Sequence, residues 1–259
     1  MPVSLSLNIQ EKINILQING RIDKSLITGE ISFSTTQEIK SLPPGSVAKV
    51  HLKRTPNLGL VVPNEAYASY DTSDEQQDRF IIDLNRLILE TASPIQVFKY
   101  QVVTDSPETL CPILITPVWK CEPKQSSLLL NYTLNKTLLQ SLGQQQLSIA
   151  AAVEGGGEIS NVQTKPSGAW DAETRVLIWQ YADLVNDNWN GKILARFDST
   201  EPCEPLPITI WFSTTSGILS CIELDVVSDA SKDDVQVVVE SIAKSVSSGR
   251  FGAQVSIIQ

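Results

Sequence analysis

The side chains that most often carry out catalysis are few and scattered in this sequence. His51 is the only histidine, and a nucleophilic triad needs a base placed beside its nucleophile. No G-x-S-x-G motif accompanies it, so His51 is interpreted as a residue on a strand face. Asp225, Asp233 and Asp234 could pair as acid and base, but adjacent carboxylates in an extended chain point to opposite faces. We therefore predict no catalytic residue and no enzyme activity.

Metal and cofactor sites are not predicted either. The four cysteines, Cys111, Cys121, Cys203 and Cys221, contain no C-x-x-C pair of the kind that structural zinc sites use. They are interpreted as reduced thiols. The stretch 154–158, Glu-Gly-Gly-Gly-Glu, lacks the Lys-Ser/Thr end and the following helix of a phosphate-binding loop. A hairpin turn is the interpretation of this stretch.

Composition narrows the classes of function. The 259 residues include 29 acidic and 20 basic side chains, and the resulting net charge of −9 disfavours broad nucleic-acid binding. Hydrophobic content of 42% suffices for a substantial core. No apolar run approaches the roughly 18 residues that span a membrane, and the N-terminal residues lack the pattern of a signal peptide. We expect a cytoplasmic protein that does not span the membrane.

Most of the chain is predicted to form β-strands, because apolar and polar residues alternate between Gly, Pro and Asn turn signals. Asn19-Gly20 is a strong hairpin signal. The stretch 98–131 contains prolines that break its strand pattern, and such strands lie at edges, ends or bulges. It is interpreted as a crossover between two β modules, with Trp119 as a structural anchor. The other tryptophans are also interpreted as core residues.

One segment departs from alternation. Apolar residues at Phe80, Ile81, Leu84, Leu87 and Ile88 have the spacing of one face of a helix. The spacing predicts a helix over about 73–91 that packs on a sheet.

Several short motifs, taken together and in order, are those of a known family. The chain resembles the mu-homology domain of the muniscins, endocytic adaptors with an F-BAR domain at their N-terminus, and the fungal, budding-yeast type in particular. The motifs are Tyr100-Gln101-Val102, Val118-Trp119-Lys120-Cys121, Val153-Glu154-Gly155-Gly156, Asn161-Val162-Gln163, Ala169-Trp170, Gly191 to Asp198, and Ser248-Gly249-Arg250-Phe251.

The resemblance implies an elongated all-β fold of two β-sandwich subdomains, the second inserted into the first. Residues 1–110 and 215–259 would form subdomain A, which carries the helix. Residues 111–214 would form subdomain B. The resemblance also favours a strand over a helix for the valine-rich stretch 235–246, which the residue pattern alone leaves open.

The resemblance further implies a non-catalytic adaptor at clathrin-coated pits, peripheral to the plasma membrane and cell cortex. Its partners would be cytosolic tails of transmembrane cargo and an EH-domain endocytic scaffold protein. Related adaptor medium chains read tyrosine-based sorting signals in a pocket whose positions correspond here to Ser6, Asn8, Ser241 and Ala243. These residues offer no aromatic wall, carboxylate or guanidinium, so we predict that this pocket does not function.

The cluster Lys49, His51, Lys53 and Arg54 is the candidate contact for acidic partners or, weakly, for anionic lipid head groups. A solvated strand face is the simpler interpretation of the same residues. The alternative function is a structural β-sandwich module for self-association or for cytoskeletal or septin organisation at the cell cortex.

Overall fold

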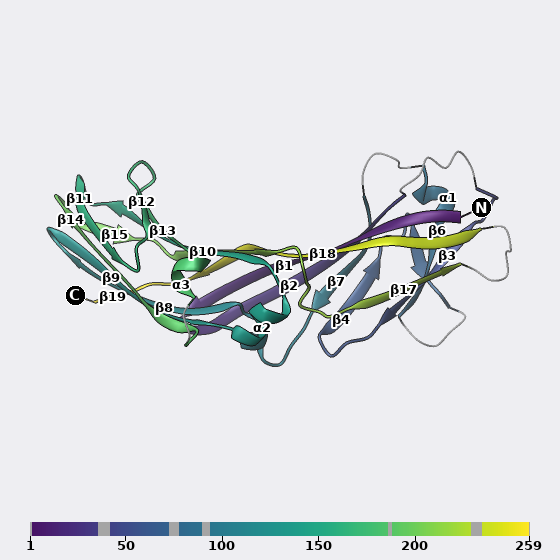
Figure 1. Ribbon diagram of the computed structural model, residues 1–259, viewed down its shortest axis with the longest axis horizontal. Helices are drawn as coiled ribbons and strands as arrows, with labels where there is room; N and C mark the ends of the chain where they lie inside the picture. Colours follow the sequence, from purple (N-terminus) through teal and green to yellow (C-terminus); the bar gives the residue numbers. More distant parts are fainter. Residues whose placement is uncertain are drawn as a thin grey trace. The chain divides into compact units, whose positions relative to one another are not determined.

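The computed structural model describes residues 2–35, 42–72, 78–89, 94–185, 188–228 and 235–258, and strands dominate it (Figure 1). Its contacts divide the chain into two compact units. The first unit comprises Met1–Lys12, Ile27–Thr104 and Thr215–Val246. The second comprises Ile13–Leu26, Asp105–Thr214 and Ser247–Gln259. The prediction of an all-β fold is confirmed.

The first unit contains two sheets. One has the strand order β18-β1-β2-β7-β4, with β18 at Gln236–Ala253, β1 at Pro2–Ile18, β2 at Arg21–Thr35, β7 at Ile95–Val102 and β4 at Leu58–Pro63. The other has the order β17-β3-β6-β5, with β17 at Glu223–Ser228, β3 at Val47–Lys53, β6 at Arg79–Asp83 and β5 at Ala68–Tyr70. Phe33, Phe80 and Phe98 are fully buried, and the Phe80 and Phe98 ring centroids lie 4.8 Å apart.

A buried carboxylate helps to hold the first unit together. Glu11 on β1 is only 2% exposed, and its oxygens accept hydrogen bonds from the Tyr100 hydroxyl at 2.8 Å and from the backbone amides of Leu219 and Ser220. Burial, and then the negative charge of Glu11, raises the pKa of Tyr100 well above its usual value. The Tyr100 ring also covers Gly29, where an added Cβ would overlap it.

The second unit also contains two sheets. In one, the order β12-β13-β10-β16 continues into β18, β1 and β2, with β12 at Ala169–Asp171, β13 at Val176–Gln180, β10 at Gln145–Gly155 and β16 at Ile208–Thr214, and β15 at Cys203–Pro205 paired to β10. The other has the order β11-β14-β9-β8-β19, with β11 at Ile159–Lys165, β14 at Asn190–Ser199, β9 at Gln125–Leu134, β8 at Ile113–Glu122 and β19 at Ser256–Ile258.

The core of the second unit is anchored by Trp119, which is 0% exposed and whose ring centroid lies 6.1 Å from that of Phe197. Gln17 is equally buried. Its side-chain amide donates to the Ile113 carbonyl at 2.9 Å and accepts from the Ile115 amide at 2.8 Å. Both ends of a buried polar group are thus satisfied. Trp211, by contrast, is 49% exposed, so its interpretation as a core residue was wrong, and Trp170 and Trp189 are only half-buried.

The predicted helix over about 73–91 is wrong for most of its described length. Residues 73–77 and 90–93 lie outside the described residues. Arg79–Asp83 is strand β6, which pairs with β3, and the only helix here is the four-residue α1 at Leu84–Leu87. A short strand that buries Phe80 and Ile82, followed by one helical turn that buries Leu84 and Leu87, reproduces the apolar spacing of a longer helix.

The remaining short helices lie in the second unit: the 3-10 helix η1 at Pro107–Leu110, α2 at Lys136–Ser141 and α3 at Tyr181–Leu184. The Glu-Gly-Gly-Gly-Glu turn is not a hairpin, because β10 and β11 belong to different sheets. Its three glycines have φ of +68°, +82° and +57°, a region that glycine enters without steric cost. They redirect the chain from one sheet to the other.

The observed units differ from the expected subdomain boundaries at three places. Residues 13–26, 105–110 and 247–259, expected in subdomain A, belong to the second unit. For the first and last of these, the reason is that β1, β2 and β18 have 17, 15 and 18 residues, longer than usual strands of about 3 to 10, so each contributes residues to both units. The Asn19-Gly20 turn between β1 and β2 has φ of +51° and +73°, as the hairpin prediction requires.

Candidate functional site

The predicted basic cluster lies on β3 and just after it, in the first unit, among acidic side chains. Lys53 Nζ is 2.9 Å from Glu223 Oε2 and 3.9 Å from Asp225 Oδ2. The hydrogen bond that Lys53 donates to Glu223, and then the charge of Asp225, raise the pKa of Lys53. Arg54 Nε is 2.7 Å from Asp78 Oδ2. The cluster is therefore a face of mixed charge.

The other two members of the cluster, His51 and Lys49, also lie on β3. His51 lies opposite Asp225 in the strand register and is half-buried. Lys49 is also half-buried and lies opposite Val227. The structure brings the four predicted residues together, but it places three carboxylates beside them. A contact with acidic partners or lipid head groups stays a prediction.

The positions that correspond to the tyrosine-signal pocket lie on the neighbouring strands β1 and β18. Ser241 Oγ donates to Ser6 Oγ at 2.8 Å, so the structure brings these two together. Asn8 and Ala243 lie two residues further along their strands. The outward side chains here are small and uncharged, which is consistent with the predicted loss of the pocket. That no peptide binds at this position stays a prediction.

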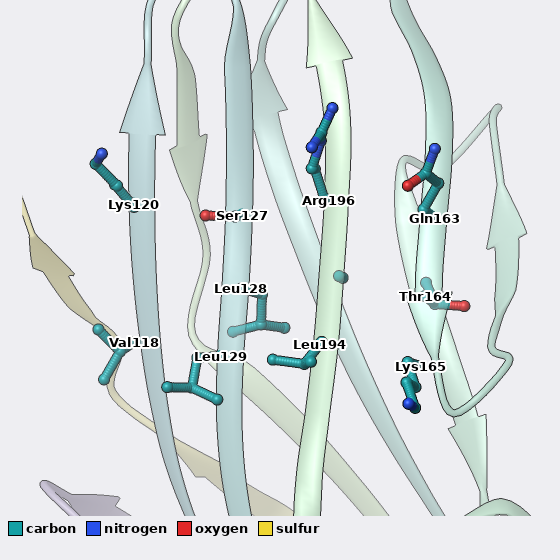
Figure 2. A pocket seen from close by; sticks show the side chains of 11 residues that line it. Val118, Lys120, Ser127, Leu128, Leu129, Gln163, Thr164, Lys165, Leu194 and Arg196 are labelled. Atoms are coloured by element: carbon teal, nitrogen blue, oxygen red, sulfur yellow. The ribbon is translucent and has the colours of Figure 1, made fainter.

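A groove of about 460 Å³ lies on the outer face of the five-stranded sheet in the second unit. Four strands contribute to it, in the order β8, β9, β14 and β11 (Figure 2). We call it the cationic groove. Its lining consists of Val118, Lys120, Ser127, Leu128, Leu129, Gln163, Thr164, Lys165, Leu194, Ala195 and Arg196.

The register places the outward side chains of the cationic groove in two rows that cross the strands. In the apolar row, Val118 is paired with Leu129, and Leu129 with Leu194. Leu194 is 46% exposed. Lys165 continues this row on β11. Figure 2 shows the three apolar side chains on three successive strands.

The second row is polar and cationic. Lys120 is paired with Ser127, Ser127 with Arg196, and Arg196 with Gln163. Successive residues on one face of a strand are about 7 Å apart and neighbouring strands about 4.8 Å apart. Lys120 and Arg196 are therefore about 10 Å apart at their backbones, across three strands, with the apolar row directly beside them.

Electrostatics distinguish this groove from the basic cluster. Its lining contains Lys120, Lys165 and Arg196 but no carboxylate, although the chain as a whole carries −9. Lys120 Nζ pairs at 2.8 Å with Glu122, which lies outside the lining. Like the equally exposed Lys53–Glu223 pair, this contact partly offsets the charge of the cation. At the end of the face, hydrogen bonds from Asn161 and Gln125 lower the pKa of Asp198.

The chemistry of the groove is that of binding. Its lining has hydroxyls in Ser127 and Thr164 but no imidazole or carboxylate that could activate them. Among the described residues, no group of three His, Cys, Asp or Glu side chains could hold a metal ion. An open apolar row flanked by cations suits an extended segment with apolar and acidic side chains.

Sequence reasoning missed the groove, although one signal was present. In Gly-Lys-Ile-Leu-Ala-Arg-Phe, the buried positions Ile193, Ala195 and Phe197 alternate with outward Lys192, Leu194 and Arg196. Leu194, an outward leucine between two outward cations, is that signal. The strands next to it could not be assigned from the sequence, because pairing partners are far apart along the chain.

Comparison with known proteins gives the family. The family profile described as "Muniscin C-terminal mu homology domain" matches residues 3–254. The chain is 23% identical over 251 residues to F-BAR domain only protein 2 of Mus musculus, covering 88% of this chain but 30% of that protein. It thus spans less than a third of the length of this relative.

Solved structures agree at the level of the fold. The Fcho1 mu homology domain of Danio rerio with a bound Eps15 peptide has a TM-score of 0.73 at 18% identity, covering 97% of both chains. The yeast delta-COP-I mu-homology domain complexed with a Dsl1 WxWxV peptide has a TM-score of 0.57 at 14% identity, covering 96% of this chain and 98% of that one. The fungal type stays a prediction. The chain belongs to the muniscin family, of which it is the C-terminal mu-homology domain.

Proposed function

We propose that this domain binds cytosolic tails of membrane-protein cargo and an early-arriving EH-domain scaffold protein at clathrin-coated pits. It performs no catalysis and acts in the cytoplasm, peripheral to the plasma membrane and cell cortex. The observation that carries the proposal is the cationic groove, where an apolar row lies beside Lys120 and Arg196 with no carboxylate in the lining. Two relatives with the same fold, at low identity, hold peptides. None of the described helices has the length and apolar character needed to cross a membrane.

The test is titration calorimetry of this domain with an Eps15 peptide as probe. Binding should weaken about ten-fold in Arg196→Glu and again on raising the salt concentration, because exposed charges are screened over about 8–10 Å. Leu194→Ala should weaken it without changing the salt dependence. Lys12 is exposed on β1, outside the groove. Lys12→Glu changes the net charge by the same amount as Arg196→Glu, so it is the control and should have little effect on binding. Equal affinities for wild type and Arg196→Glu would contradict this site, and absence of binding would contradict the proposed function.

The basic cluster on β3 is a secondary contact in this proposal. Reversing the charges of Lys49, Lys53 and Arg54 together should weaken binding to anionic vesicles only slightly, because Glu223, Asp225 and Asp78 already lie beside two of these cations. Vesicle sedimentation measures this. Unchanged vesicle and partner binding would remove the cluster from the proposal.

One observation favours the alternative, a self-associating structural module. The terminal strand of a sheet in the first unit, β4, exposes Leu60 by 69% and Val62 by 48%, and exposed apolar edges invite pairing between chains. Sedimentation velocity distinguishes the two functions. A stable dimer that Leu60→Lys disperses, together with absent peptide binding, would favour the structural module.

A further inference from the structure

The outer face of the other sheet in the second unit carries a groove of different chemistry. Trp211 on β16 is 49% exposed, whereas Trp119 and Trp179 are completely buried. The groove around Trp211 measures about 700 Å³. We call it the Trp211 groove; its lining consists of Gln145, Gln146, Leu147, Ser148, Gln180, Tyr181, Ala182, Trp211, Phe212, Ser213 and Ser248.

Strand register places the outward residues of this groove in one row. Trp211 is paired with Ser148, and Ser148 with Gln180. Their neighbours Ile210, Ile149 and Trp179 point into the core and are 0% exposed. The row therefore crosses β16, β10 and β13 on the outer face, with an indole at one end and a primary amide at the other. The two ends are separated by two strand spacings, about 10 Å.

The floor of the groove is fixed by hydrogen bonds. The backbone amide of Phe212 donates to Ser248 Oγ at 3.0 Å, which holds β18 beside β16 next to the indole. The Tyr181 hydroxyl lies 3.0 Å from the end of the Gln145 side chain, so the two polar groups are neighbours at the start of α3. The surface around Trp211 is thus built before any ligand arrives, which reduces the entropy that binding must overcome.

The lining contains no Asp, Glu, Lys, Arg or His, in a chain where 19% of residues are charged. An acidic or basic ligand would gain nothing here and would lose hydration. The indole, amide and hydroxyl groups of Trp211, Gln180 and Ser148 can all donate hydrogen bonds. A ligand that fits this set is uncharged, presents a flat apolar surface to the indole and offers unpaired carbonyl oxygens.

A proline-rich segment in the polyproline II conformation has these properties. Its prolines lack an N–H, its carbonyls are not used internally, and its repeat of three residues advances about 9.3 Å. That repeat matches the distance of about 10 Å between the Trp211 and Gln180 ends of the row. Aromatic-lined grooves are the established way in which proteins read such segments.

We propose that the Trp211 groove binds an uncharged, proline-rich extended segment of a partner protein, independently of the cationic groove. A proline ring packs on the Trp211 indole, and a carbonyl one turn along accepts a hydrogen bond from the Gln180 amide. Because the two grooves lie on different sheets of the same unit and differ in charge, one domain can hold two kinds of segment.

The test uses titration calorimetry with a synthetic peptide of about ten prolines, and a Gly-Ser peptide of equal length as the control ligand. The proline peptide should bind saturably, and the affinity should change less than about two-fold between about 50 and 300 mM NaCl, since no charge is involved. Trp211→Ala should weaken binding at least about ten-fold, as expected for an aromatic anchor. Gln180→Ala, a milder change, should weaken it about three-fold.

Matched controls separate this inference from the proposed function. Arg196→Glu and Leu194→Ala, in the cationic groove, should leave binding of the proline peptide unchanged, and Trp211→Ala should leave binding of the Eps15 peptide unchanged. Absence of saturable binding at millimolar peptide, or equal affinities for wild type and Trp211→Ala, would overturn the inference. A dimer of the free domain that Trp211→Ala disperses would also overturn it, because the face would then bind a second copy.

Discussion

Replacing Glu11 by Gln tests whether a buried carboxylate holds the first unit together. Glu11 accepts three hydrogen bonds, from the Tyr100 hydroxyl and from the amides of Leu219 and Ser220. Glutamine has the same shape but only one acceptor oxygen. If that oxygen faces Tyr100 and Ser220, the glutamine NH₂ faces the Leu219 N–H, and two donors oppose each other.

The expected loss follows from these contacts. A hydrogen bond to a charged acceptor contributes about 1.5–3 kcal/mol, and a buried donor left without a partner costs about 1–3 kcal/mol. Relief of the buried charge offsets part of the sum. We expect Glu11→Gln to lower the free energy of unfolding by about 3 kcal/mol, which corresponds to a fall in Tm of roughly 6–12 °C in a chain of this size.

Urea unfolding followed by far-UV circular dichroism measures the loss, because all five tryptophans lie in the second unit and would not report on the first. Hydrogen exchange at the Leu219 amide gives a local readout. Glu30→Gln is the matched control, because Glu30 is half-exposed, pairs with Lys99 at 3.7 Å and should change stability by less than about 0.5 kcal/mol. The reasoning is refuted if Glu11→Gln is as stable as Glu30→Gln, or if the Leu219 amide stays equally protected.

Trp119→Ala should lower the free energy of unfolding by about 3–5 kcal/mol, because it leaves a cavity beside Phe197, and it should leave peptide specificity intact. A variant that melts like wild type would contradict the role of Trp119 as an anchor. Above pH 10, the free energy of unfolding should fall more steeply in wild type than in Tyr100→Phe, by up to about 1.4 kcal/mol per pH unit. The reason is that folding raises the pKa of Tyr100, so the unfolded chain loses the tyrosine proton from about pH 10 upward while the native state still holds it. Parallel alkaline unfolding curves for the two proteins would exclude this. Native-state labelling with a thiol reagent should modify exposed Cys221 first and Cys111 last, since burial raises the pKa of the Cys111 thiol to about 12. A Tyr-x-x-apolar peptide should not bind at the Ser6–Ser241 position, and saturable micromolar binding abolished by Ser241→Arg would show the opposite.

Much of the fold could be predicted from local patterns. The alternation of apolar and polar residues predicted that most of the chain forms strands, as it does, and Asn19-Gly20 predicted the hairpin between β1 and β2. Alternation works because one face of each of these strands is buried and the other is not. Helical spacing was misleading at Phe80–Leu87, where a short strand and one helical turn together reproduce the period of a longer helix.

The candidate site could not be predicted, for a physical reason. The rows of the cationic groove exist only after β8, β9, β14 and β11 have paired, and register depends on the whole core. Glu11 is an example of the same limit, since its partners are 89 and 208 residues away in the chain. From the sequence it is one charge in a strand, and only the fold shows that it is buried.

The contact between Gly29 and the Tyr100 ring constrains the order in which this domain can change during evolution. A side chain at position 29 would overlap the ring, so Gly29→Ala is excluded for as long as Tyr100 is present. Once Tyr100 is replaced by a smaller residue, the Glu11 carboxylate loses a donor and position 29 becomes permissive. Positions 29 and 100 are thus coupled, so that substituting both should lower stability by less than the sum of the two single substitutions.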